Sequence, residues 1–318
     1  MTEHDLDSVF QDDWPDDHRS GLVAVVGRPN VGKSTLINAI LGQKIAIVTP
    51  KPQTTRKQQL GIFTVEHGQI VFVDTPGLHK PHHKLGEFMV SDAESALRDA
   101  DLILWVLDVS TGPQEGDNHI AETVARLRGN TPVILVLNKA DLLSDENHKA
   151  RIAAYTALIP HEQVLLVSAL QNSGVTELVT DLLARLPLGP RYYPVDQVSE
   201  ANMRFIASEI IREKIILLTE KEIPYSVAVE IEEYKERSED MTYIGAVVYV
   251  ERDSQKGIII GKSGAMIKQI GAESRAELQE ELGTQVYLDL RVKVLKNWRS
   301  DEALMRRLGY RMPKDDKQ

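Results

Sequence analysis

The chain has 318 residues, of which 42% are hydrophobic and 26% are charged, and its formal net charge is −10. This length allows two domains, and this hydrophobic content allows each of them to bury a core. The absence of cysteine excludes disulfides and thiolate metal sites, and the net negative charge excludes a general attraction for polyanions. Because the sequence contains no apolar run of about 18 residues and no signal-peptide pattern, we expect a soluble, cytoplasmic protein.

An acidic segment, residues 1–19, comes first, and its low apolar content predicts a disordered tail. Residues 22–26 form a β-branched run that predicts a strand, and residues 34–41 predict a helix. The sequence between them, GRPNVGKS at 27–34, has the pattern of a phosphate-binding loop. In such a loop, backbone N–H groups surround phosphate oxygens at the positive end of a helix dipole. We therefore expect nucleotide phosphates to contact Gly27, Arg28, Pro29, Asn30, Val31, Gly32, Lys33, Ser34 and Thr35.

Three side chains of this loop predict chemistry beyond binding. Lys33 can reach the β- and γ-phosphates, and the Ser34 hydroxyl can bind Mg²⁺. Asn30 admits two interpretations: its side-chain carbonyl coordinates a monovalent cation such as K⁺ beside the phosphates, or the side chain only stabilises the loop. In the first interpretation, the cation takes the place of an arginine finger during hydrolysis.

The segment KPQTTR at 51–56 lies before a predicted strand at 58–65, and its proline and two threonines are typical of a mobile loop. Loops of this kind become ordered around Mg²⁺ and the γ-phosphate, and they relax after hydrolysis. We expect Thr55, rather than Thr54, to bind the Mg²⁺ when the γ-phosphate is present.

The motif DTPG follows a predicted strand at 69–73. Asp74 is expected to hold Mg²⁺ through water, and the Gly77 N–H is expected to contact the γ-phosphate. Leu78 stands where many P-loop nucleotide hydrolases place a glutamine that orients the attacking water. Because leucine cannot hydrogen-bond a water molecule, either another group assists the hydrolysis or the hydrolysis is slow. The nucleotide contacts expected in this loop are Asp74, Thr75, Pro76, Gly77 and Leu78.

A second nucleotide motif, NKAD at 138–141, follows an apolar run at 131–137 that predicts a strand buried on both faces. The Asp141 carboxylate can accept two hydrogen bonds from guanine, whereas adenine would leave that buried carboxylate unpaired. Asn138 is expected to tie this loop to the phosphate loop. The sequence therefore predicts GTP or GDP binding, with further contacts from a loop that follows a strand at 163–167. The expected residues are Asn138, Lys139, Asp141, Ser168, Ala169 and Leu170.

Strands and helices alternate over residues 20–186, which predicts an α/β domain: a mostly parallel six-stranded sheet with one antiparallel strand and helices on both faces. A proline-rich stretch, residues 187–200, indicates a linker. We expect an α+β domain at 201–311 and a polar tail at 312–318. The elements expected in this second domain are a helix at 203–219, strands at 225–234 and 242–250, a short β-branched strand at 256–260, a helix at 265–282 and a strand at 285–295.

The tetrapeptide GKSG at 261–264 is the candidate RNA-binding feature of the second domain. Its two glycines let the backbone approach nucleic-acid phosphates, and the groove beside such a loop accepts about four nucleotides. The tetrapeptide alone is also compatible with a plain turn at a helix start. Lysines surround it, and no acidic residue lies between 256 and 268. The expected RNA contacts are Lys256, Gly261, Lys262, Ser263, Gly264 and Lys268.

The chain resembles the Era family of bacterial GTPases over about residues 20–310, in its motifs GRPNVGKS, PQTTR, DTPGLH, NKAD, SAL and GIIIGKSG. The resemblance implies a P-loop GTPase domain followed by a type II KH domain, with Mg²⁺-dependent GTP hydrolysis and binding near the 3′ end of 16S ribosomal RNA. It also implies a role in 16S rRNA processing and small (30S) ribosomal subunit assembly. A mostly monomeric state and a loose peripheral association with the inner face of the cell membrane are further implications of the resemblance.

Two functional hypotheses from different classes remain. In the first, the chain is a GTPase whose nucleotide state controls RNA binding, and the set Lys33, Ser34, Thr55 and Asp74 favours it. In the second, the chain is an RNA-binding assembly factor that holds nucleotide as a structural ligand with incidental turnover. Leu78 favours this second hypothesis.

Overall fold

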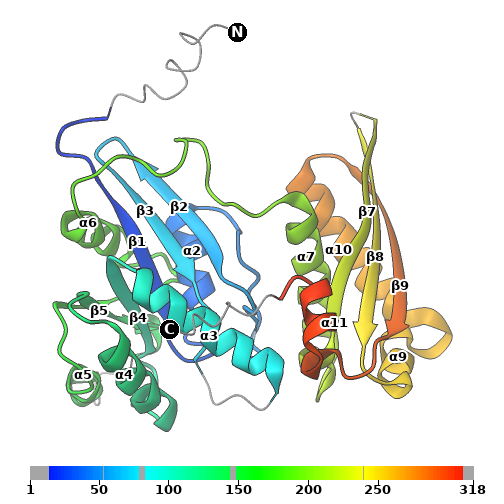
Figure 1. The fold of residues 1–318 in the computed structure, drawn as a ribbon, viewed down its shortest axis with the longest axis horizontal. Coiled ribbons are helices and arrows are strands. Elements are labelled where there is room, and N and C mark those ends of the chain that lie inside the picture. Colours follow the sequence, from blue (N-terminus) through cyan, green and yellow to red (C-terminus); the bar gives the residue numbers. More distant parts are fainter. Residues whose placement is uncertain (1–13, 53, 79–82, 144–147, 239, 311–318) are drawn as a thin grey trace, which may run out of the picture.

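The structure is a computed structural model that describes residues 14–52, 54–78, 83–143, 148–238 and 240–310. Several sequence predictions fall outside these ranges: the N-terminal tail up to residue 13, the C-terminal tail at 312–318, and Gln53 and His79 within their motifs. Two bodies stand side by side, each built around its own sheet. An extended stretch after helix α6 (Val175–Arg185) joins them (Figure 1).

The first sheet has six strands in the order β2-β3-β1-β4-β5-β6. Strand β2 runs antiparallel to β3, and the other neighbouring pairs are parallel. The predicted six-stranded, mostly parallel sheet is therefore confirmed. The strands are β1 (Arg19–Val26), β2 (Gln59–Val65), β3 (Gly68–Asp74), β4 (Leu102–Asp108), β5 (Val133–Asn138) and β6 (Gln163–Leu166).

Helices cover both faces of this sheet. Helices α3 (Lys84–Asp99), α4 (Glu115–Leu127) and α5 (His148–Thr156) pack on one face, while α2 (Lys33–Leu41) and α6 pack on the other. Alternate residues of the central strands enter opposite layers, which explains why these strands are apolar throughout. The carboxyl ends of the parallel strands meet at one edge of the sheet, and the loops with the nucleotide motifs leave from this edge.

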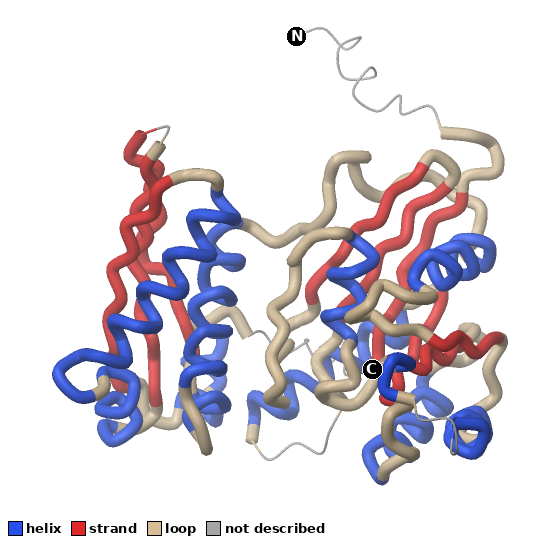
Figure 2. Tube along the Cα trace, turned by 180° about the vertical axis from the view of Figure 1, so that it is seen from behind, coloured by secondary structure: helices blue, strands red, loops and turns tan. Residues whose placement is uncertain are grey.

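The second sheet has the order β7-β8-β9, with β7 antiparallel and β9 parallel to β8. Helices α7 and α10 lie together against one face of this sheet (Figure 2). None of the described helices has the length and apolar content needed to cross a membrane. The elements of this domain are α7 (Met203–Leu218), α8 (Ile223–Ser226), β7 (Ala228–Ser238), β8 (Met241–Val250), α9 (Asp253–Ile260), α10 (Ala265–Leu282), β9 (Gln285–Val294) and α11 (Glu302–Arg307), with short 3-10 turns at Lys262–Gly264 and Trp298–Ser300. A further 3-10 turn, Ala140–Leu142, follows β5 in the first domain.

Two predicted strands of the second domain differ from the structure. The strand expected from residue 225 begins only at Ala228, because the preceding residues form α8, with Pro224 in its first turn, where proline is tolerated. The β-branched strand expected at 256–260 is wrong, since these residues belong to α9. The Gln255 side chain accepts the backbone N–H of Arg252 at 3.1 Å and so caps this helix, which overrides the weak strand propensity of the isoleucines.

Helix α3 connects the two domains through an apolar cluster. Its residues Leu85, Phe88 and Met89 pack with Trp298 and Tyr310 of the second domain. The Phe88 ring meets the Tyr310 ring edge-on at 5.6 Å between centroids, a favourable geometry for two aromatic rings. Helix α3 begins shortly after the DTPG motif. The sheet edge that carries the nucleotide motifs is therefore linked through α3 to a packing contact with the second domain.

Candidate nucleotide and RNA sites

Two glycines give the loop between β1 and α2 its shape. Both have positive backbone φ angles, 153° for Gly27 and 100° for Gly32. A Cβ atom on Gly27 would lie 2.3 Å from the Val106 carbonyl oxygen, and one on Gly32 would lie 2.3 Å from the amide nitrogen of Asn138. Any side chain at either position would therefore collide with a neighbour, so the loop needs glycine for reasons of both conformation and space.

Lys33 points into the concave side of this loop. Its ammonium donates hydrogen bonds to the carbonyl oxygens of Gly27 at 2.9 Å and Arg28 at 3.1 Å. The side chain is buried, and burial lowers the pKa of Lys33 to about 8. A bound phosphate would favour the charged form of this lysine, because an opposite charge at short range stabilises an ammonium.

Three oxygen-bearing side chains meet beside Lys33. The Ser34 hydroxyl donates to the Asp74 carboxylate at 2.8 Å, and the Thr55 hydroxyl lies 3.2 Å from both of these groups. Asp74 is fully buried, its second carboxylate oxygen has no hydrogen-bond partner among the described residues, and burial raises the pKa of this carboxyl. Two hydroxyls and an unsatisfied carboxylate form a hard oxygen donor set, which fits Mg²⁺.

Thr54 lies outside this group. Its hydroxyl bonds to the Thr49 hydroxyl at 2.8 Å and donates to the Lys51 carbonyl at 2.9 Å. The geometry therefore favours Thr55 over Thr54 as the magnesium ligand. A cavity of about 60 Å³ is lined by Thr55, Lys33 and Ser34, together with Pro29, Asn30, Gly32, Thr35, Thr54 and Gly77 of the expected loops.

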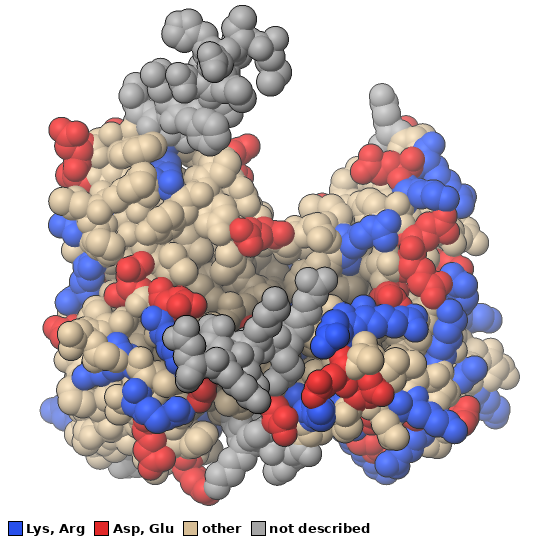
Figure 3. All heavy atoms as spheres, viewed as in Figure 1, with Lys and Arg blue, Asp and Glu red and all other residues tan. Residues whose placement is uncertain are grey.

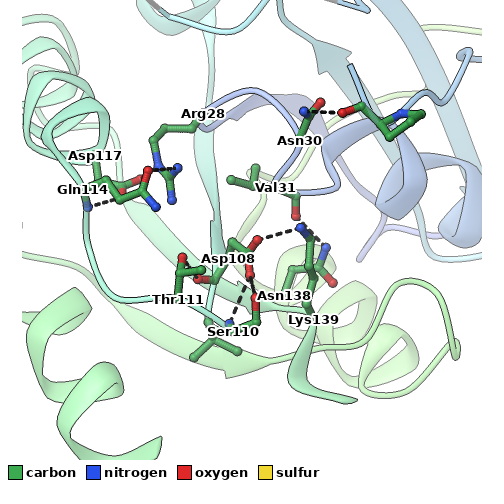
Figure 4. A network of polar contacts seen from close by, with 12 residues as sticks. Arg28, Asn30, Val31, Asp108, Ser110, Thr111, Gln114, Asp117, Asn138 and Lys139 are labelled. Carbon is green, nitrogen blue, oxygen red and sulfur yellow. Dashed lines mark hydrogen bonds and ion pairs between the residues drawn. The ribbon is translucent and has the colours of Figure 1, made fainter. Parts of the chain in front are cut away.

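Leu78 and Asn30 lie in different environments at this edge. Leu78 is buried in the apolar core beneath α3, so it does not face the phosphate cavity. Asn30 has a left-handed backbone, φ 64°, and its amide nitrogen donates to the Pro50 carbonyl oxygen at 2.7 Å (Figure 4). The phosphate loop is thereby bonded to the segment that carries Thr55.

Asn138 joins three loops at the base side of the site. Its amide nitrogen donates to the Val31 carbonyl at 2.8 Å, and its side-chain oxygen accepts the Ala169 N–H at 3.0 Å. The Asp141 carboxylate accepts the Ser168 hydroxyl at 2.5 Å, which orients it within the same loop pair. These bonds hold residues of the NKAD and SAL motifs together next to the phosphate loop, and Figure 4 shows Asn138 pointing toward Val31 of that loop.

The remaining expected residues differ in exposure. The Leu170 side chain is 81% exposed. The Thr75 side chain is buried, and its hydroxyl donates to the Val25 carbonyl at 2.8 Å, which anchors the start of the DTPG loop to β1. Among the expected contacts, Thr75 thus has an evident structural role in the fold.

Asp108 is a supporting residue that the sequence reasoning missed. Its carboxylate lies 2.6 Å from the Lys139 ammonium and accepts the Ser110 N–H at 3.0 Å. Burial raises the pKa of Asp108, but the bonds from Lys139 and Ser110 lower it more, and the net shift is downward. Asp108 is the last residue of β4, at the same sheet edge as the motifs. A carboxylate at the end of a parallel strand is the sequence feature that could have indicated its place in the site.

A second missed contact fixes the phosphate loop from the side. The Arg28 guanidinium donates to the buried Asp117 carboxylate at 2.7 Å and to the Gln114 side chain at 2.8 Å (Figure 4). Burial lowers the pKa of Arg28 and the Asp117 carboxylate raises it, with a net upward shift. Arg28 is thus held toward α4, and no spacing in the sequence indicated this pair.

The GKSG motif forms a tight connection between α9 and α10. Gly261 and Gly264 have φ angles of 72° and 79°, and Ser263 has 53°, so three of the four residues have positive φ. A Cβ on Gly261 would lie 2.8 Å from the Met266 backbone nitrogen, which requires glycine there. The side chains of Lys262 and Ser263 are exposed at the tip of this turn, where a phosphate backbone can reach them.

A groove of about 360 Å³ runs beside this motif, between α10 and β9. Lys268 and Arg275 supply its positive charge, and Leu288 and Leu290 form its apolar floor. Arg275 was not among the expected contacts, although its place about two helical turns after Lys268, on the same helix face, offered a signal. On the face of this domain shown in Figure 3, lysine and arginine atoms are interspersed with aspartate and glutamate atoms. This face therefore has no extended surface of purely positive or purely negative charge.

Comparisons with known proteins assign both domains. A family model described as a 50S ribosome-binding GTPase matches residues 22–139, and a KH domain model matches residues 222–299. The GTPase Era of Carboxydothermus hydrogenoformans is 47% identical over 296 residues, covering 92% of this chain and 98% of that protein. This chain belongs to the Era family of GTPases. The predicted fold, a P-loop GTPase domain followed by a KH domain, is thus confirmed, and so is the enzyme class.

Two solved structures of Era proteins are similar to this Era-family chain over 92% of its length and 99% of theirs. One is Era in complex with MgGDPNP and nucleotides 1506–1542 of 16S ribosomal RNA, with 39% identity and a TM-score of 0.88. The other is a single-substitution variant of Aquifex aeolicus Era bound to GDP·AlF4⁻, with 40% identity and a TM-score of 0.87.

Proposed function

We propose that this chain binds and hydrolyses GTP with Mg²⁺, binds the 3′ region of 16S rRNA through its KH domain, and acts in 16S rRNA processing and small ribosomal subunit assembly. The observation that carries the proposal is the similar Era structure, which holds MgGDPNP and a 16S rRNA segment on a fold with a TM-score of 0.88. GTP, GDP and rRNA are thus the expected ligands.

In the proposed reaction, the chain's own groups bind and orient the nucleotide. The Asp141 carboxylate accepts hydrogen bonds from guanine, and Lys33 and the loop N–H groups hold the phosphates. Ser34, Thr55 and Asp74 would hold Mg²⁺, which when bound neutralises phosphate charge. The Gly77 N–H contacts the γ-phosphate. Most of the catalytic effect comes from positioning and electrostatic stabilisation.

Buried Leu78 provides no hydrogen bond to the attacking water, so turnover needs another group. We propose that Asn30 supplies it by coordinating K⁺ beside the phosphates. The bond to Pro50 uses the amide nitrogen of Asn30, so its oxygen keeps the capacity to bind a cation. A monovalent cation there would stabilise the charge that develops between the phosphates, as an arginine finger does.

The proposed RNA site combines the GKSG turn with the groove along α10. Backbone approach at Gly261 and Gly264 and the charge of Lys256, Lys262 and Lys268 would hold phosphates, and the apolar floor would receive unstacked bases. This arrangement suits a short single strand better than a duplex, because a duplex hides its base edges.

A turnover assay tests this function. GTP hydrolysis is measured with the full chain in K⁺ and in Na⁺, with and without an RNA that has the 3′ sequence of 16S rRNA, and with a scrambled RNA as control. The proposal requires hydrolysis above background, and stimulation by the matching RNA only. Nucleotide that remains bound without turnover in all conditions would favour the structural-ligand alternative, which Leu78 supports.

Four further points are proposals: cytoplasmic location, loose association with the inner face of the cell membrane, a mostly monomeric state, and domain boundaries at 20–186 and 201–311 around a linker at 187–200. Cell fractionation at low and high salt tests the first two. Analytical ultracentrifugation tests the third, and limited proteolysis that cuts first at 187–200 would support the fourth.

A further inference from the structure

We propose that the junction between the two domains contains a binding site for a small oxyanion of the phosphate class. The site is a cavity of about 30 Å³ lined by Arg56 and Lys57 of the first domain, and by α7, the start of β7 and Tyr310 of the second. None of its lining residues lines the nucleotide cavity or the groove along α10, so it is separate from both sites described above.

Positive charge dominates the cavity wall. Arg56, Lys57 and Arg212 line it, against the single carboxylate of Glu209. Arg56 and Arg212 are each only 2% exposed, so water does not screen their charges. Buried charges are costly unless they are paired. The excess of positive charge at this buried place therefore favours an anion.

Arg212 has one donor group to spare. Its Nε donates to the Glu209 carboxylate at 2.8 Å, and its Nη2 donates to the same carboxylate and to the Thr54 carbonyl. Its Nη1 is buried and has no hydrogen-bond partner among the described residues. A buried N–H without an acceptor costs about 1–3 kcal/mol, so an oxyanion that accepts it would remove this cost.

Arg56 shows the same pattern from the other side of the junction. Its two terminal nitrogens donate to the carbonyls of Val227 at 2.6 Å and Pro224 at 3.0 Å, while its buried Nε has no partner within the described part of the chain. Burial lowers the pKa of Arg56, and the Arg212 charge lowers it further, while Tyr310 and Glu209 only partly offset this shift. Lys57 bonds to the Leu308 carbonyl at 3.2 Å, and an ammonium has three donors.

These donors suit a tetrahedral oxyanion, because guanidinium and ammonium groups form short, charge-assisted bonds with phosphate oxygens. The small volume excludes a nucleotide or an RNA strand. Inorganic phosphate is the product of GTP hydrolysis, so the enzyme itself would generate this ligand. A bound anion would hold residues 54–57 against α7, and Thr55 of the proposed magnesium site lies within that segment.

The test measures binding of inorganic phosphate to the full chain by calorimetry, at constant ionic strength and with saturating Mg·GDP to fill the nucleotide site. The variants are Arg212→Gln and Lys57→Gln, each of which removes one cationic wall group. Arg204→Gln is the matched control, since Arg204 is an exposed arginine on the same helix α7. Thermal melting of each variant without phosphate shows whether it is folded.

We expect saturable phosphate binding in the unmodified chain and in Arg204→Gln, and a dissociation constant at least about tenfold higher in both cavity variants. Absence of binding in the unmodified chain would overturn the proposal. Equal affinity in Lys57→Gln and Arg212→Gln to that of the unmodified chain would also overturn it, because phosphate would then occupy the nucleotide site or another surface. If Arg212→Gln does not fold, Lys57→Gln alone decides, since Lys57 is only half-buried.

Discussion

Replacing Asp92 by asparagine should stabilise the chain at neutral and alkaline pH. Asp92 lies on α3, and its carboxylate accepts the Gln58 backbone N–H at 2.7 Å. Burial raises the pKa of Asp92 to about 6, although the Gln58 N–H and the Lys57 charge lower it. The unfolded pKa is about 3.9, so the shift of about 2 units corresponds to at most about 3 kcal/mol. The side chain is partly exposed, and about 1–3 kcal/mol is therefore expected.

The sign of this effect follows from linkage. A carboxyl whose pKa is raised by folding contributes stability that is present below the unfolded pKa and is lost as pH rises through about 6. The side-chain amide of the Asp92→Asn variant would keep an acceptor for the Gln58 N–H without a buried charge. The free energy of unfolding of this variant should exceed that of the unmodified chain by about 1–3 kcal/mol at pH 8, and by less than about 1 kcal/mol at pH 4.5.

Urea titrations of the full chain at both pH values measure this difference. Asp99→Asn is the control, because Asp99 is an exposed aspartate on the same helix. A difference that does not grow between pH 4.5 and pH 8, or that is matched by Asp99→Asn, would refute the reasoning. Burial would then not determine the pKa of the Asp92 carboxyl.

Three further predictions concern the proposed sites. Asp141→Asn should weaken GTP binding by at least about tenfold, about 1.4 kcal/mol, and shift preference toward xanthine nucleotides, whose C2 carbonyl can accept from the new amide; unchanged GTP affinity would contradict the role of Asp141. Asn30→Ala should erase any rate advantage of K⁺ over Na⁺ with little effect on GDP affinity, and equal rates in the unmodified chain would rule out the cation. Lys262→Asp with Ser263→Asp should weaken RNA binding at least about tenfold, with a weaker salt dependence and with GTP binding retained. Unchanged RNA affinity would locate the RNA site elsewhere.

The first domain could be predicted closely because its signals are local. The apolar strands next to GRPNVGKS and NKAD have both faces buried, so their sequence runs coincide with the strands of the sheet. Asp108 and the pair Arg28–Asp117 were missed for a physical reason. Each depends on a contact between side chains that lie far apart in the sequence, and no fixed spacing relates them.

The second domain was predicted less well where tertiary contacts decide the structure. The run at 256–260 has the composition of a strand, but Ile259 alone faces the core while Ile258 is 48% exposed, a helical pattern too short to recognise. The cavity at Arg56 and Arg212 gave no signal at all, because it exists only where the two domains meet.

The two hydrogen bonds of the Asn138 side chain join the phosphate loop, at Val31, to the proposed guanine-binding loop, at Ala169. The two loops are therefore expected to become ordered together. A ligand that orders either loop also reduces the entropy that the other loop must lose on binding. Guanosine and pyrophosphate, added as separate molecules, should therefore bind with positive cooperativity. In such an enzyme, the affinity for the phosphates depends on whether the base is bound, and the Asn138 side-chain amide couples the two.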